Sequence, residues 1–438
     1  MLVGGQSDRG AMSTITHHSM AVVAASVILL ATGSYHRSLQ APVAEDEELE
    51  GRVPTAIELV PSVEAAFRRE SYAPGETATL TVRPEPTPVT IRLFRVGPER
   101  TTTRGNNEMQ GVAMTPLRTI EDGKVPIAIG DWPSGLYFAR LDAPDGRVGF
   151  APFVVRPPVL GASRVAIVLP TLTWQAYNLR DDDGDDRPDS WYGDWKRRTM
   201  RIGRPFLNRG VPYHFRRYDL PFVHWLARSG RDVDVLTDED LDELPDGSAL
   251  AVAYDLIVFP GHHEYVTTHE YDVIERYRDL GGNLAFLSAN NFFWKVVKRG
   301  DVVTKSMQWR DLGRPEAALL GVQYRGNDSG EARGSWIVRD VPAAEWLFAG
   351  TDIRPGSRFG ADWGIEIDRT SADSPKGVQV IAEIPDLFGP GFTAQMTYYE
   401  TVYGAKVFAT GAFTLAGQAL EPGVKRVLAN LWARLGRP

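Results

Sequence analysis

The sequence predicts an immunoglobulin-like β-sandwich followed by a doubly wound, mostly parallel α/β domain. Between residues 55 and 157, short stretches of strand-forming residues alternate with turn signals at the spacing typical of a sandwich. From residue 160 onward, apolar runs alternate with helix-like stretches, which is the pattern of strand–helix–strand units. We therefore assign residues 55–157 and 160–438 to two domains, divided at Pro157-Pro158.

The composition allows a large core and excludes several classes of function. Of the 438 residues, 43% are hydrophobic and 11 are tryptophan. The net charge of −8 argues against a nucleic-acid partner, because binding to phosphates needs a basic surface. The absence of cysteine rules out disulfides, thiolate metal sites and cysteine nucleophiles.

The first 50 residues have the pattern of a targeting segment and a linker. The apolar stretch Met20–Gly33 is shorter than the roughly 20 residues of a membrane-spanning helix and fits the core of a secretory signal. An acidic run, Glu45–Glu50, follows it as a solvated linker. We expect the protein to be exported to the periplasm or cell exterior, with the signal cleaved or retained as a membrane anchor.

The predicted sandwich rests on strands and turns that can be identified one by one. Ala73-Pro74-Gly75-Glu76 is a turn, and Val89–Leu93 alternates apolar and polar residues as a half-buried strand does. Asp145-Gly146 is a hairpin signal between two further strands. The region contains no cluster of catalytic residue types, so we predict a structural or docking role for it.

The predicted α/β domain begins with the buried strand Arg164–Leu169. A helix is expected from Tyr218 to Leu226, and Arg231–Leu236 is the next strand. The chain closes with an amphipathic helix, Val424–Leu435, whose apolar residues recur at helical spacing.

The most informative stretch of this domain contains two strands that each end in a polar loop. Leu256–Phe259 is followed by His262 and Glu264, and Leu284–Leu287 is followed by Asn290. Ligands of open α/β sheets bind outside the carboxyl ends of the strands, so we expect these three side chains to converge.

An imidazole and a carboxylate at the spacing His262-x-Glu264 serve either metal binding or general acid–base catalysis. Tyr177 follows the strand Arg164–Leu169 in a polar loop, and Tyr218 stands at the start of a helix. From the residues alone, each tyrosine is either functional or a partly buried side chain with a satisfied hydroxyl. Ser288 lacks the Gly-x-Ser-x-Gly surroundings of a hydrolase nucleophile.

The loop Asp181–Asp189 contains a dense series of aspartates around Gly184. Its Asp-x-Asp-Gly-Asp core resembles calcium loops, whose ligands are hard oxygen atoms, but it lacks the bidentate glutamate of an EF-hand. A bound Ca²⁺ and a solvated acidic loop are the two interpretations.

The chain from about Ala73 onward resembles the large (beta) subunit of N,N-dimethylformamidase and its relatives. The resemblance implies a C-terminal domain like the class I glutamine amidotransferases. It is carried by six motifs: Thr173–Asn178, Tyr218–Phe222, Gly261–Tyr265, Ser288–Asn291, Gly364–Arg369 and Met396–Glu400.

The resemblance implies a mononuclear Fe(III) held by two tyrosinates and a glutamate, which match Tyr177, Tyr218 and Glu264. Tyr213 lies near Tyr218 in the sequence and competes with it for the second position. The family's catalytic groups match three further residues, which are His262, Asn290 and Glu366. The implied activity is hydrolysis of the C–N bond of a small amide, with the ion polarising the carbonyl group.

The resemblance also implies a small subunit or a homo-oligomer as a partner. A different hypothesis is an exported, non-catalytic protein that binds a ligand such as a carbohydrate, with Tyr177 and Trp174 stacking on a sugar ring. Metal content discriminates between the two, because a sugar-binding protein needs no tyrosinate iron.

Overall fold

The computed structural model describes residues 61–83, 88–101, 103–121, 123–192, 196–328 and 330–436. The predicted signal or anchor Met20–Gly33 and the acidic linker Glu45–Glu50 lie outside these residues. Within the described ranges, no helix has both the length and the apolar character that crossing a bilayer requires.

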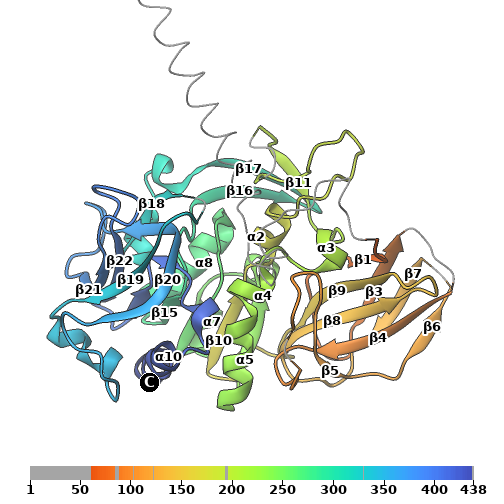
Figure 1. Cartoon of the computed structure of the whole chain (residues 1–438), viewed down its shortest axis with the longest axis horizontal. Helices are drawn as coiled ribbons and strands as arrows, with labels where there is room; N and C mark the ends of the chain where they lie inside the picture. The colour runs from red at the N-terminus through yellow and green to blue at the C-terminus, as the bar shows by residue number, and fades with distance from the viewer. Residues whose placement is uncertain are drawn as a thin grey trace, which may run out of the picture. The chain divides into compact units, whose positions relative to one another are not determined.

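The N-terminal part consists of two β-sheets (Figure 1). The first sheet has the order β1 (Glu64–Phe67), β3 (Thr77–Arg83), β7 (Lys124–Ala128). The second has the order β2 (Ser71–Tyr72), β9 (Val148–Val155), β8 (Gly135–Asp142), β4 (Val89–Arg95), β5 (Val112–Ala113), with β6 (Arg118–Ile120) also paired to β4.

The sequence signals for this region are confirmed. Val89, Ile91 and Leu93 of β4 are buried while Thr90 and Arg92 are more exposed, which is the predicted alternation. The hairpin that joins β8 and β9 closes with a hydrogen bond from the Ala143 amide to the Arg147 carbonyl, and Gly146 adopts the left-handed φ of 88° that this turn requires.

A larger sheet contains the strands that follow. Its first part is parallel, as predicted, in the order β12 (Asp234–Thr237), β10 (Val165–Leu169), β13 (Leu256–Phe259), β15 (Asn283–Phe286), β23 (Lys406–Ala409). The sheet continues in the order β22 (Ala394–Glu400), β21 (Gln379–Ile384), β19 (Arg333–Val338), β20 (Arg358–Arg369), β18 (Gln323–Asn327), and β24 (Ala412–Phe413) pairs with β20.

This continuation differs from the mostly parallel sheet that the sequence predicts. All of its ladders are antiparallel, from β22–β23 to β18–β20. Several of these strands follow one another through connections too short for a helical crossover, and short connections can only join antiparallel strands.

A further sheet lies above the carboxyl ends of the parallel strands. It has the order β11 (Thr199–Arg201), β17 (Val302–Gln308), β16 (Trp294–Arg299), β14 (Tyr265–Thr267). Its strand β14 begins directly after Glu264, so this sheet and the polar loop are built from the same segment.

The α-helices are α2 (Thr171–Ala176), α3 (Leu207–Gly210), α4 (Phe215–Tyr218), α5 (Leu220–Ser229), α6 (Asp238–Asp242), α7 (Ser248–Ala253), α8 (Thr268–Asp279), α9 (Glu316–Leu320) and α10 (Pro422–Leu435). Three 3₁₀ helices are η1 (Trp309–Leu312), η2 (Pro342–Phe348) and η3 (Ala416–Gln418). In α10 the residues predicted to form the apolar face are buried, namely Val424, Val427, Leu428, Leu431 and Leu435.

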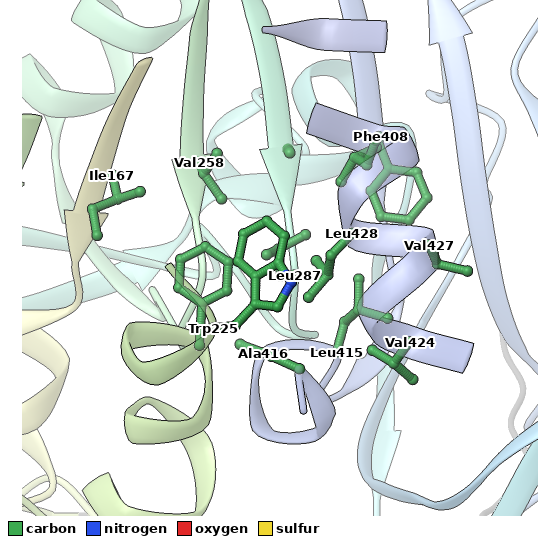
Figure 2. Packing of buried hydrophobic residues seen from close by; sticks show 14 of the residues in the cluster. Ile167, Trp225, Val258, Leu287, Phe408, Leu415, Ala416, Val424, Val427 and Leu428 are labelled. Carbon is green, nitrogen blue, oxygen red and sulfur yellow. The ribbon is translucent and has the colours of Figure 1, made fainter. Parts of the chain in front are cut away.

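The main core lies between the larger sheet and helices α5 and α10. Figure 2 shows Trp225 of α5 beside Leu287, with Leu428 of α10 packed nearby. Trp225 is 1% exposed, and its ring lies 5.6 Å from that of Trp432. This packing lies at the end of β15, where the polar loop that carries Asn290 begins.

The described chain is thus a β-rich, multidomain protein with helices, as predicted. The more specific descriptions, an immunoglobulin-like sandwich and an amidotransferase-like α/β domain, stay predictions, as do the boundaries at residues 157 and 160.

Candidate active site

The loop after β13 carries His262 and Glu264, and short polar contacts fix its path. The Glu264 amide donates to Thr173 Oγ1 at 3.1 Å, and the His263 amide donates to Asn291 Oδ1 at 2.9 Å. These bonds tie the loop to α2 on one side and to the loop after β15 on the other. The predicted convergence of strand-end loops is therefore present in the structure.

Four polar side chains meet at the centre of the site. The Tyr177 hydroxyl donates to Glu264 Oε2 at 2.8 Å. His262 Nε2 lies 3.2 Å from both Tyr177 Oη and Glu264 Oε2, and 3.4 Å from Glu366 Oε2. His262 and Glu264 are buried, so these charges interact in surroundings poor in water.

The imidazole of His262 has a defined orientation. Its Nδ1–H donates to the Ala289 carbonyl at 3.0 Å, which directs Nε2 toward the two carboxylates. Burial alone would lower the pKa of His262, but the charges of Glu366 and Glu264 outweigh burial and raise the pKa to about 9. In the protein without a metal ion, His262 is therefore a cation at neutral pH.

Glu366 faces this histidine from β20. Burial, followed by repulsion from Glu264, raises the pKa of Glu366 to about 7, although His262 and a hydrogen bond from Asn290 act in the opposite direction. Its Oε2 atom is buried and has no hydrogen bond. A carboxyl group with a pKa near 7, 3.4 Å from an imidazole nitrogen, is suited to taking up and releasing protons.

Asn290 reaches Glu366 from an uncommon backbone conformation. Its φ is 53°, in the left-handed region, and its amide donates to the buried carboxylate of Asp368 at 2.8 Å. The Asn290 side chain donates to Glu366, and its Oδ1 atom is buried without a hydrogen bond.

Tyr177 is the C-terminal cap of α2. The sequence pattern predicts a polar loop here, but residues 171–176 form a short helix, and the Leu172 amide in its first turn donates to Asp238 Oδ2 at 2.7 Å. Burial, followed by the charges of Glu264 and Glu366, raises the pKa of Tyr177 well above its usual value. The phenol therefore stays neutral unless a cation binds beside it.

Tyr218 stands at the edge of the site. Its ring lies 5.3 Å from that of Phe413, which in turn lies 4.7 Å from His262. Burial raises the pKa of Tyr218 to about 12. The competing Tyr213 stacks at 6.4 Å from Tyr177. The choice of Tyr218 as second tyrosine ligand stays a prediction.

The structure adds aromatic side chains that the sequence analysis does not identify. Tyr192 stacks on Tyr177 with ring centroids 4.7 Å apart, and Phe413 covers His262. Tyr324 of β18 also belongs to the surroundings, because burial and then the charge of Glu366 raise its pKa. No local sequence pattern marks these residues, since each comes from a segment distant in the chain.

The acidic loop forms a second cluster of carboxylates. Carboxylate oxygens of Asp181, Asp183 and Asp189 lie within 4.8 Å of one another. Arg197 pairs with Asp183 at 3.4 Å and also with Asp189. Because this guanidinium already supplies positive charge, the Ca²⁺ interpretation stays a prediction beside that of a solvated loop.

Gly261 gives a first test of the site's geometry. A Cβ atom at this position would lie 2.6 Å from Asp219 Oδ1 and 2.7 Å from Pro170 Cγ, closer than real contacts allow. We expect Gly261→Ala to displace the loop that carries His262 and Glu264 and so to lower at least tenfold the affinity for the Fe(III) that the family resemblance implies. The measurement is metal content after dialysis. Gly423→Ala is the control, because a Cβ there would meet only Ile353 Cδ1 at 3.9 Å and the backbone needs no positive φ. Equal metal content in both variants would contradict the expectation.

Comparison with known proteins gives one consistent result. Residues 123–423 match the protein family described as "N,N-dimethylformamidase beta subunit-like, C-terminal". The beta subunit of N,N-dimethylformamidase from Paracoccus aminophilus is 33% identical over 305 residues, which cover 55% of this chain and 39% of that protein. The subunit of the same name from an Alcaligenes species is 32% identical over the same lengths. The matched region is thus about two fifths of these relatives.

Two solved structures that align with this chain do so with low scores. A superoxide reductase (neelaredoxin) from Ignicoccus hospitalis aligns over 25% of this chain and 91% of its own, with 15% identity and a TM-score of 0.16. A cycloisomaltooligosaccharide glucanotransferase from a Paenibacillus species aligns over 80% of this chain and 69% of its own, with 10% identity and a TM-score of 0.18. Scores this low establish no shared fold.

Proposed function

Because the chain belongs to the N,N-dimethylformamidase beta subunit-like, C-terminal family, we propose that it is an amidohydrolase that cleaves the C–N bond of small amides. One observation carries the proposal: Tyr177, His262, Glu264 and Glu366 come from three segments and are joined by contacts of 3.4 Å or less at His262 Nε2 and Glu264 Oε2. The site combines hard oxygen donors with groups that exchange protons.

The donor set fits a ferric ion. Tyr177 and Glu264 already place phenol and carboxylate oxygens side by side, and hard, anionic oxygens suit Fe(III). We propose that these two residues, with Tyr218, hold a mononuclear Fe(III). When bound, the ion supplies Lewis acidity that polarises a carbonyl group and acidifies water. The raised pKa of Tyr177 fits this role, because a neighbouring cation is what would ionise the phenol.

The remaining polar groups account for the protons of amide hydrolysis. Water adds to the amide carbon, the C–N bond breaks, and the products are a carboxylic acid and an amine. Glu366 takes the proton that the water loses, and His262, directed by its bond to Ala289, gives a proton to the departing nitrogen. Asn290 donates to the carbonyl oxygen as charge develops on it.

The relatives are named as beta subunits, so we also propose that the active assembly contains a second, smaller subunit or several copies of this chain. Export or anchoring through Met20–Gly33 stays part of the proposal. Cell fractionation tests the location, and copurification with size determination tests the assembly.

Glu366→Gln tests the role of the proton acceptor. The amide keeps the shape but cannot accept a proton, so we expect turnover of a panel of small formamides and acetamides to fall by about 10²–10⁴-fold while iron content stays unchanged. Glu345→Gln is the matched control, because the same exchange is made at an exposed glutamate of η2. Unchanged turnover in Glu366→Gln would refute the assignment. A wild-type protein without iron and without activity toward any amide would refute the proposed function.

A further inference from the structure

Asn290, the proposed donor to the substrate oxygen, has a backbone conformation that most residues avoid. Its φ is 53°, in the left-handed region that glycine adopts without strain. Asparagine tolerates this region better than most residues, but it still prefers a negative φ. Such a conformation persists only where the surrounding structure holds it. The loop after β15 therefore needs a partner that fixes Asn290.

That partner is Asp368 of β20. The Asn290 amide donates to Asp368 Oδ1 at 2.8 Å, which is the distance of a well-formed hydrogen bond. Both residues are buried, with 1% of Asp368 and 3% of Asn290 exposed. The bond therefore joins the loop after β15 to a strand that lies 78 residues further along the chain.

The same strand also contacts the side chain of Asn290. Glu366, two residues before Asp368, accepts a hydrogen bond from the Asn290 side-chain amide. Alternate residues of a strand project to one face, which explains why both carboxyl groups reach the same loop residue. A side-chain amide has two N–H groups, so one of them remains available to an oxygen atom of the substrate.

The backbone of Asp368 is bonded to the larger sheet. Its amide donates to the Gly411 carbonyl at 2.9 Å, and the residue lies opposite Tyr324 in the ladder between β18 and β20. Asp368 thus bonds to the sheet through its backbone and to the loop through its side chain. It connects the position of Asn290 to the antiparallel part of the sheet.

Packing alone does not require a carboxyl group at this place. Burial raises the pKa of Asp368 to about 8, although the bond from the Asn290 amide acts in the opposite direction. An apolar residue of similar size would avoid the cost of burying a carboxyl group, but it could not accept the Asn290 amide. A protonated carboxyl group keeps an oxygen atom that accepts, as a side-chain amide does. The acceptor is what the carboxyl group supplies.

We propose that Asp368 is a positioning residue: by accepting the Asn290 amide, it holds the Asn290 side chain where that side chain donates to the carbonyl oxygen of the substrate. This inference rests on the proposed function. Asp368 acts through Asn290 alone and takes no part in proton transfer. Without the acceptor, the buried amide loses its partner and Asn290 relaxes toward a negative φ, which turns its side chain away from the substrate.

The first test is turnover of small amides by the iron-loaded full chain. Asp368→Asn keeps an acceptor oxygen and should lose at most about fivefold in kcat, whereas Asp368→Ala should lose about 10²-fold with KM nearly unchanged, because such a donor acts mainly in the transition state. Asp234→Ala is the matched control. Asp234 is also 1% exposed and accepts the amides of Gly161 and Ser163, but it lies at the amino end of β12. This variant should lose stability and keep the wild-type kcat.

An Asn290→Gly background separates positioning from a general structural role. Glycine adopts the φ of 53° freely and has no side-chain amide, so nothing is left for Asp368 to position. In this background Asp368→Ala should lower kcat by less than about threefold, because the two residues act as one unit. A full second loss in this background, or a wild-type kcat in Asp368→Ala alone, overturns the proposal.

Hydrogen exchange tests the bond without turnover and so separates this proposal from the proposed function. The Asn290 amide should exchange about 100-fold more slowly in the wild type and in Asp368→Asn than in Asp368→Ala. Fast exchange in the wild type overturns the proposal even if the protein hydrolyses amides. Slow exchange without hydrolysis of any amide refutes the proposed function, and the positioning role with it, while the bond stands. If Asp368→Ala does not fold, Asp368→Leu fills the space without an acceptor and takes its place, with the same expected losses.

Discussion

Tyr177→Phe is expected to remove bound iron and hydrolytic activity together. The exchange deletes one oxygen atom, the atom that lies 2.8 Å from Glu264 Oε2 and 3.2 Å from His262 Nε2, and leaves the ring in place. We expect amide turnover to fall more than about 100-fold, because even groups that only support metal ligands contribute roughly 10- to 100-fold. The phenolate-to-iron absorption band in the visible spectrum should disappear at the same time.

Tyr192→Phe is the matched control for this exchange. Tyr192 stacks on Tyr177 with ring centroids 4.7 Å apart and is 37% exposed, so the variant loses a hydroxyl group beside Tyr177 and keeps the Tyr177 hydroxyl. It should keep its iron and its colour. A Tyr177→Phe protein with full iron content and full activity would remove the basis of the ferric proposal. Parallel measurements on Tyr213→Phe and Tyr218→Phe decide which of these two is the second ligand.

Much of this site could be predicted because topology follows from local patterns. The apolar runs before His262 and Asn290 are buried parallel strands, and parallel strands bring their carboxyl ends to one edge. The position of these two loops, including that of Glu264, therefore follows from residues within a 40-residue stretch. Val424–Leu435 was predictable for the same reason, since its helical periodicity is strong and local.

Glu366 could not be placed by such reasoning. It lies on β20, in the antiparallel part of the sheet, where short connections and irregular ladders replace the strand–helix alternation. Nothing local relates this strand to the loop at residue 262; only the family resemblance indicated it. The bond between Asp368 and the Asn290 amide was equally hidden, because 78 residues separate the two in the chain. Their contact appears only in three dimensions.

Among the substitutions considered, the largest loss of stability is expected for Trp225→Ala, in the core beside the active-site loops. Trp225→Ala removes a side chain that is 1% exposed between α5, α10 and the larger sheet (Figure 2). It also removes a stacking partner of Arg231, whose guanidinium lies 4.8 Å from the ring centroid. Replacing a large buried aromatic residue with alanine lowers the free energy of unfolding by about 3–5 kcal/mol. The loss is largest where the neighbouring strands cannot move in to fill the cavity that the ring leaves.

Trp346→Ala is the matched control, because the same exchange is made at a ring that is partly exposed and bonded to the Ala343 carbonyl. Urea unfolding followed by tryptophan fluorescence and circular dichroism should place the midpoint of Trp225→Ala well below that of Trp346→Ala. Equal midpoints would mean that α5 is not part of the cooperative core.

Because Trp225 packs beside Leu287, at the end of the strand that leads to Asn290, its loss should also lower iron affinity. Trp346 is not part of the site described above, so its loss should leave iron affinity unchanged. A fall in stability without a fall in iron affinity would show that the loops hold their positions independently of the core beneath them.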